Sequence, residues 1–149
     1  MLKITAAQLN FTIGDLAGNV SKMVAAASKA WTDQSDIVVF SEMSLTAYYP
    51  GDMLEEEGFM DRVDAALLDL LLASRQIPNL YWVIGLPARR EAPGKKLRNS
   101  LCVIKGGEVL LEYAKNCCPP TTSSTSAGIS SPARTWPRSC AYATPRWAC

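Results

Sequence analysis

Along the first 115 residues, the pattern of apolar and polar positions predicts an ordered series of strands and helices. Alternation and short β-branched runs predict strands near residues 2–8, 36–40, 80–86, 98–105 and 108–114. Apolar residues that recur every three or four positions predict helices over 20–31 and within 59–76. The order β-α-β-α-β-β-β is typical of a layered α/β domain with a mixed sheet.

Some of these segments carry more specific predictions. The β-branched run 36–40 is typical of a strand buried on both faces. The GDLAGN segment, residues 14–19, predicts a turn cluster, and Lys105-Gly106-Gly107 predicts a tight hairpin between the last two strands. The apolar stripe of the first helix consists of Val20, Met23, Val24, Ala27 and Trp31.

The composition of the chain changes abruptly after Lys115. Residues 1–115 contain 12 basic and 14 acidic residues, whereas residues 116–149 contain three arginines and no acid. The last 34 residues also hold four of the five cysteines, and they lack Leu, Val, Phe and Met. Because such a segment has almost nothing to bury, it cannot continue a hydrophobic core.

Composition also excludes several kinds of active site and of binding partner. The chain has no histidine, which excludes Ser–His and Cys–His nucleophile pairs and His-ligated metal sites within it. The net charge is +1, so no charge imbalance points to nucleic acid or to a membrane surface. The N-terminus does not resemble a signal peptide, and no apolar run is long enough to span a bilayer. We therefore predict a soluble cytoplasmic protein with neither a nucleic-acid nor a membrane partner.

Two charged residues at strand ends are candidates for chemistry. Glu42 lies two residues after the predicted strand 36–40, and in α/β sheets the carboxyl ends of strands face the ligand crevice. Lys115 lies at the end of the last predicted strand. A lysine set against a carboxylate stabilises an oxyanion and adjusts the pKa of the carboxyl group. The alternative for both residues is a solvated charge at a strand end.

Four segments together resemble the nitrilase (carbon–nitrogen hydrolase) superfamily in order and spacing. They are KITAAQLNFTIGDLAGNVSKM, DIVVFSEMSLTAYYPGDML, YWVIGLPARR and RNSLCVIKGGEVLLEYAK. Within that superfamily, the QLN…GDLxGN opening and the SLTxYxPxDxL segment are most similar to the glutamine-hydrolysing amidase domains of glutamine-dependent NAD synthetases. The resemblance implies an α-β-β-α sandwich, of which this chain holds only the N-terminal half. It also implies that Glu42 is the general base and Lys115 the catalytic lysine.

The chain departs from the family pattern at three places. Ala47 occupies a position where the family usually has Gly, and Arg98 occupies one where a Tyr is common. The third departure concerns the catalytic cysteine, which the family carries in a C-E-D segment at the end of the next strand. No C-E-D segment occurs in this sequence, and Cys117 and Cys118 are too close to Lys115. The nucleophile is therefore missing from the chain as written.

A shift of reading frame explains the tail. Starting from the third base of the Asn116 codon, the genetic code forces two leucines, and it forces Ala, Gly and Leu at later positions. The degenerate triplets allow LLPTYNIFDERRYFEPG, which resembles the segment that follows the catalytic lysine in this subfamily. We predict that residues 1–115 are a partial carbon–nitrogen hydrolase domain and that residues 116–149 are a frameshifted, disordered tail. The alternative is a genuine disordered extension rich in Ser, Thr and Pro.

The resemblance implies a function for the intact protein. Glutamine would be its substrate, hydrolysed through a cysteine thioester, and the ammonia would pass to an ATP-dependent NAD-forming domain. ATP and Mg²⁺ would bind only in that further domain, so no cofactor is expected in residues 1–149. The intact protein is expected to be a homo-oligomer, and this chain to be inactive. The alternatives are a fragment of a stand-alone nitrilase-family amidase, or a non-catalytic module that pairs with intact subunits.

Overall fold

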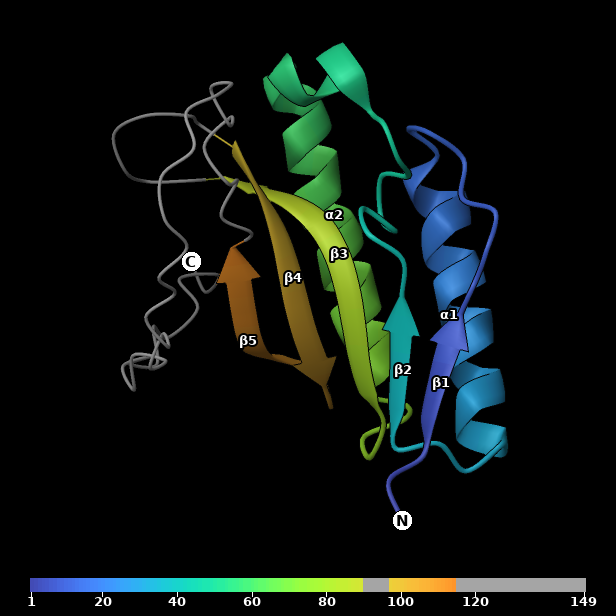
Figure 1. The fold of residues 1–149 in the computed structure, drawn as a ribbon. Coiled ribbons are helices and arrows are strands. Elements are labelled where there is room, and N and C mark those ends of the chain that lie inside the picture. Colours follow the sequence, from blue (N-terminus) through green and yellow to red (C-terminus); the bar gives the residue numbers. More distant parts are fainter. Residues whose placement is uncertain (90–96, 115–149) are drawn as a thin grey trace, which may run out of the picture. The chain divides into compact units, whose positions relative to one another are not determined.

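The computed structural model of the protein describes residues 1–89 and 97–114. In this part of the chain, a five-stranded mixed sheet carries two α-helices on one face (Figure 1). The strands are β1 (Ile4–Ala7), β2 (Ile37–Phe40), β3 (Tyr81–Arg89), β4 (Leu97–Lys105) and β5 (Glu108–Ala114). The helices are α1 (Leu16–Thr32) and α2 (Glu57–Ser74), and a short 3-10 helix, η1 (Gly51–Glu55), precedes α2.

The strands lie side by side in chain order, and their directions follow from the connections between them. The strands β1, β2 and β3 are parallel because a helix crosses over between each pair. The strands β4 and β5 are antiparallel to their neighbours, and a two-residue turn joins them at Gly106-Gly107. Both turn glycines have positive φ, as tight hairpin turns require. The predicted element order, mixed sheet and hairpin are confirmed.

The first helix begins earlier than the sequence predicts. Asp15 caps it, because the Asp15 carboxylate accepts a hydrogen bond from the Gly18 amide at 3.0 Å. A Cβ at Gly18 would lie 2.1 Å from a carboxylate oxygen of Asp15, so a larger residue there would make the Asp15 side chain shift. The prediction of a turn cluster over residues 14–19 is therefore wrong beyond Asp15: the segment from Leu16 onward is the first turn of α1.

The earlier start also changes which face of α1 is buried. The buried residues are Leu16, Asn19, Met23, Ala27 and Ala30. Met23 and Ala27 confirm the predicted stripe, and Val20 and Val24 are partly buried at its border. Trp31 is 44% exposed, so its assignment to the buried stripe is wrong. The small Ala27 and Ala30 side chains let the helix approach the sheet closely, and the next position points away from it.

The hydrophobic core lies between the helices and one face of the sheet. The sheet contributes Val38, Phe40, Trp82, Ile84, Cys102 and Ile104. The facing residues of α2 include Phe59, Val63, Leu67 and Leu70. Phe40 and Trp82 pack as a tilted aromatic pair with ring centroids 6.4 Å apart. This core anchors the ends of β2 and β3, from which the candidate site is built.

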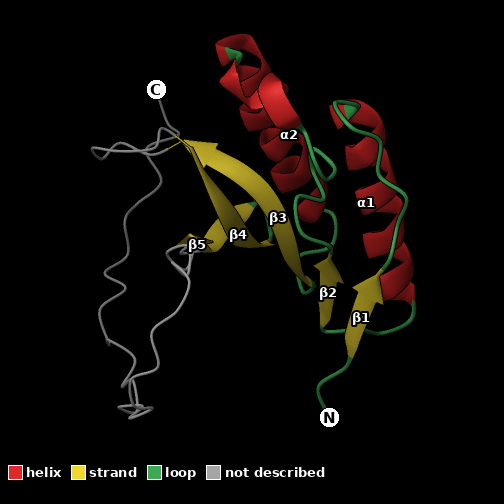
Figure 2. Cartoon of the chain, turned by 45° about the horizontal axis from the view of Figure 1, so that its top comes forward, coloured by secondary structure: helices red, strands yellow, loops and turns green. Residues whose placement is uncertain are grey.

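The opposite face of the sheet has no helix over it among the described residues (Figure 2). In β2, Val38 and Phe40 are buried, whereas Ile37 and Val39 are only half-buried. The prediction that this strand is buried on both faces is therefore wrong for the structure described, because the second face lacks a covering layer. The strand register places Tyr81, Leu101, Leu111 and Tyr113 on the same open face, and all four are exposed.

Candidate active site

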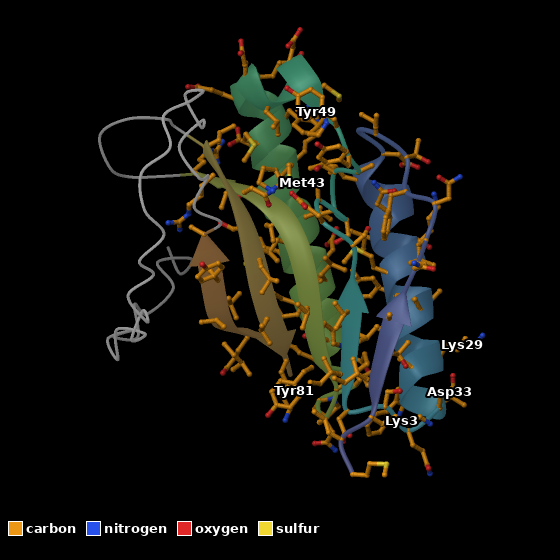
Figure 3. The ribbon with its side chains drawn as sticks, in the orientation of Figure 1. Lys3, Lys29, Asp33, Met43, Tyr49 and Tyr81 are labelled. Atoms are coloured by element: carbon orange, nitrogen blue, oxygen red, sulfur yellow. The ribbon has the colours of Figure 1, made fainter. Side chains whose placement is uncertain are left out.

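Glu42 lies at the end of the sheet where the parallel strands terminate. It follows the last residue of β2, Phe40, by two positions, as the sequence predicts. Figure 3 shows its neighbour Met43 at this end of the sheet, together with Tyr49, and shows Lys3 and Tyr81 at the other end. The position is the one at which α/β sheets usually place functional side chains.

The segment that carries Glu42 is bound to the adjacent strand β3. The Ser44 hydroxyl is fully buried; it accepts a hydrogen bond from the Gly85 amide at 3.3 Å and lies 3.4 Å from the Gly85 carbonyl oxygen. The Leu45 amide donates to the same carbonyl at 3.3 Å. These contacts fix the backbone just after Glu42 to the middle of β3.

Glycine at position 85 allows this close approach. A Cβ there would lie 2.7 Å from the Met43 amide nitrogen and 3.2 Å from the Glu42 Cα. Both are backbone atoms, so neither moves aside as the end of a flexible side chain would. Any larger residue at this position would push the Glu42 segment away from the sheet.

Asn99 on β4 orients the Glu42 carboxylate. Its side-chain amide donates a hydrogen bond to Glu42 Oε1 at 2.6 Å. Hydrogen bonds to ionised carboxylates are shorter and stronger than those between neutral groups. The bond therefore holds one oxygen of the carboxylate in place against the sheet.

A cavity of about 280 Å³ opens beside Glu42 and Asn99. Its polar lining comes from Ser41, Glu42, Asn99, Ser100 and Tyr113, and its apolar lining from Phe40, Val83, Ile84, Gly85 and Leu101. A carboxylate at the wall of a mostly apolar cavity is suited to general acid–base work on a small ligand.

Two of the three departures from the family pattern, Ala47 and Arg98, fall within the described residues. Ala47 has φ of 62°, in the left-handed region that favours glycine, which gives a physical reason for the usual Gly at this position. The Arg98 guanidinium pairs with Glu112 at 2.7 Å and does not line the cavity. The departure at Arg98 therefore leaves the described cavity wall unchanged.

Lys115, the second predicted site residue, lies outside the described residues, and so do Cys117 and Cys118. The last described residue of β5, Ala114, pairs with Ser100, the neighbour of Asn99. The end of β5 is thus adjacent to the strand that supplies the Glu42 partner. The role of Lys115 stays a prediction.

The described residues contain one cysteine, Cys102, and it is not suited to be the nucleophile. It is buried on the helix side of the sheet. Burial raises the pKa of the Cys102 thiol to about 12, and the nearby Glu112 carboxylate adds to the effect. Because the thiolate is the reactive form, this thiol is inert near neutral pH.

The described part of the chain offers neither a metal site nor a membrane-spanning helix. No group of three or more His, Cys, Asp or Glu side chains there is arranged to hold a metal ion. None of the described helices is both long enough and apolar enough to cross a membrane.

The chain belongs to the carbon-nitrogen hydrolase family, whose model matches residues 3–131. The match extends past Lys115, so the comparison places no boundary at that residue, and the predicted division of the chain at Lys115 stays a prediction.

Similar curated proteins are glutamine-dependent NAD(+) synthetases. The chain is 35% identical to that of Aquifex aeolicus over 119 residues, which are 80% of this chain and 20% of the relative. It is 33% identical to that of Synechocystis over 126 residues, 81% of this chain and 22% of the relative. The chain therefore spans about a fifth of the length of these relatives.

Solved structures of the same family share the fold. A glutamine-dependent NAD+ synthetase from Acinetobacter baumannii has a TM-score of 0.69 at 27% identity, over 80% of this chain and 22% of that one. An amidase of the nitrilase superfamily from Nesterenkonia has a TM-score of 0.65 at 24% identity, over 76% of this chain and 42% of that one. The predicted nitrilase-type fold, present in part, is confirmed.

Sequence reasoning missed three residues that shape the site: Ser44, Gly85 and Asn99. Gly85 lies in the middle of a predicted strand, and an isolated glycine there indicates a close backbone approach. Asn99 gave no signal of its own, because its contact with Glu42 joins residues 57 positions apart. Only the strand order brings these two side chains together.

Proposed function

We propose that residues 1–115 are the first part of a glutamine-hydrolysing amidase domain, whose intact form supplies ammonia for ATP-dependent NAD synthesis. The observation that supports the proposal most strongly is the hydrogen bond from Asn99 that holds the Glu42 carboxylate at the wall of a cavity. The similarity to glutamine-dependent NAD(+) synthetases supports glutamine as the amide.

The proposed chemistry follows from one carboxylate and one thiol. Glu42 accepts the proton of a cysteine thiol, and the thiolate sulfur attacks the amide carbon. The C–N bond then breaks, Glu42 returns the proton to the leaving nitrogen, and ammonia departs from a thioester. Water attacks the thioester while Glu42 accepts its proton, and glutamate leaves as the thiol reforms. Each half of the reaction thus uses the same positioned base.

Lys115 would stabilise the oxyanion that forms in both halves. It follows directly after Ala114, which pairs with the strand that carries Asn99. The nucleophilic cysteine would come from the next strand of the domain, encoded in the shifted frame. ATP and Mg²⁺ would be used by a synthetase domain beyond it.

Resequencing the codons around Lys115 tests the proposal. We expect one additional base near Asn116, which restores a frame that continues into a C-E-D segment and, further on, an ATP-pyrophosphatase domain with an S-G-G-x-D-S loop. An unaltered sequence over these codons would place the shift in the genome, and downstream DNA that encodes no C-E-D segment in the shifted frame would contradict the proposal.

A stand-alone amidase is the second candidate function. The fold neighbours include a nitrilase-superfamily amidase with a TM-score of 0.65, close to the 0.69 of the synthetase. The sequence downstream discriminates between the two, because only a synthetase continues into an ATP-pyrophosphatase domain after the amidase domain ends.

A further inference from the structure

Two segments that the sequence singles out separately, residues 14–19 and residues 44–46, are in direct contact. The Gly14 amide donates a hydrogen bond to the Thr46 carbonyl at 3.3 Å. A second bond joins Asn19 on α1 to Leu45. The first segment therefore braces the backbone that follows Glu42.

Asn19 is the central residue of this brace. It is fully buried, and its side-chain amide donates to the Leu45 carbonyl at 3.0 Å and to the Thr12 carbonyl at 2.8 Å. Its side-chain oxygen accepts from the Thr12 amide at 2.9 Å. If Asn19 served only to pack α1 against the sheet, an apolar residue of similar size would suit the position better. Burying an amide costs free energy unless the amide is hydrogen-bonded. The polar residue is explained by the backbone groups that it joins.

The other residues of the segment 14–19 set the position of Asn19. The Asp15 cap starts α1 at Leu16, and Gly18 leaves room for that cap. One turn later, Asn19 faces Leu45. On the other side, Ser44 and Leu45 are bound to Gly85 on β3. The backbone that follows Glu42 is thus held between α1 and β3.

We propose that Asn19 is a positioning residue for Glu42, acting through the backbone of residues 44–46 and setting the Glu42 carboxylate against Asn99. The GDLAGN segment is then a brace for the general base and not a ligand-binding loop. The inference rests on the proposed role of Glu42 for its catalytic meaning. The experiment below measures the surroundings of the Asn99 side chain and not activity. It can therefore contradict the role of Asn19 without contradicting the catalytic role of Glu42.

The test follows the NMR resonance of the Asn99 side-chain amide in the ¹⁵N-labelled chain 1–149. This resonance is assigned by its disappearance in the Asn99→Ala variant. This group lies on β4 and reports on the Glu42 carboxylate that it contacts. We expect the resonance to shift in Asn19→Ala and in Asn19→Asp, which retains the size of the side chain. The backbone amides of residues 44–46 should exchange with solvent about tenfold faster, as expected for the loss of one buried hydrogen bond.

Ser74→Ala is the matched control. The Ser74 hydroxyl is also fully buried; it accepts from the Gly107 amide at 2.8 Å and donates to the Leu71 carbonyl at 2.8 Å. This variant should lower the stability of the chain and leave the Asn99 resonance in place. An unchanged resonance in both Asn19 variants, or an equal shift in Ser74→Ala, would contradict the proposal. Complete unfolding of both Asn19 variants would assign Asn19 to the fold as a whole and would also overturn it.

Discussion

Asn99 on β4 donates a hydrogen bond to Glu42 at 2.6 Å and thereby links the fourth strand to the loop after the second. If Glu42 is the general base, the loss of this bond removes one of the contacts that orient its carboxylate toward the amide. Misplacing a catalytic group by about 1 Å costs on the order of 100-fold in rate. We expect Asn99→Ala in the frame-restored protein to lower kcat for glutamine hydrolysis by roughly tenfold to a hundredfold.

The control for this variant is Asn79→Ala, because Asn79 is exposed and lies before β3, at the other end of the sheet. It should leave kcat unchanged. A frame-restored Asn99→Ala protein with the same kcat as its parent would show that this hydrogen bond does not matter for the reaction.

Gly85→Ala should destabilise the chain, because the new Cβ would lie 2.7 Å from the Met43 amide nitrogen. Overpacking of this kind typically costs about 1–3 kcal/mol. Gly58→Ala is the matched variant, since a Cβ at this helical position meets nothing within 4 Å. It should stabilise the chain by up to about 0.5 kcal/mol, less than at a helix-interior site, because Gly58 lies in the first turn of α2. Urea unfolding measures both, and equal free energies of unfolding for the two variants would contradict the close approach at Gly85.

Ala47→Gly should stabilise the chain, because Ala47 has φ of 62°. The left-handed conformation costs a residue with a Cβ about 1–2 kcal/mol, and the greater flexibility of glycine in the unfolded state offsets part of this gain. Ala47 is also buried, so the lost methyl contacts offset more of the gain, and we expect at most about 0.5 kcal/mol of added stability. Ala27→Gly, inside α1 and fully buried, should instead lose at least about 1 kcal/mol. A loss of similar size in both variants would contradict the strain at Ala47.

The Cys102 thiol should be unreactive in the folded chain and should make stability depend on pH above 9. Its pKa is raised from the ordinary 9.0 to about 12. Below pH 9 the thiol is protonated in both states, so its contribution to stability is complete. Between pH 9 and 12 only the unfolded chain releases the proton, and the free energy of unfolding therefore falls with rising pH.

Cys102→Ala removes this thiol and leaves the other titrating groups in place. The loss of stability between pH 9 and 11 should be smaller in this variant than in the parent. Mass mapping of alkylated peptides should also find Cys102 unmodified at pH 8 until the chain unfolds. Rapid modification of native Cys102 would contradict its burial.

The sequence predicts those parts of the structure that depend on local periodicity. The order of elements along the chain, both helices and the hairpin at Gly106-Gly107 follow from spacing and turn residues. Glu42 follows from its position after a buried strand. The Asn19–Leu45 and Asn99–Glu42 contacts do not, because they join residues 26 and 57 positions apart. The partial exposure of Ile37 and Val39 does not follow from the sequence either, since a β-branched run does not reveal which of its faces is covered.

The measurement that tests the central claim most directly is ammonia release from glutamine. It compares the chain 1–149, the frame-restored protein, and the restored protein carrying Glu42→Gln. The restored protein should release ammonia, and Glu42→Gln should lower the rate by about 10²–10⁴-fold, the usual contribution of a general base. The chain 1–149 should release none above background, because it lacks the C-E-D segment that carries the nucleophile. A soluble, cooperatively folding chain 1–149 that hydrolysed glutamine would contradict the account.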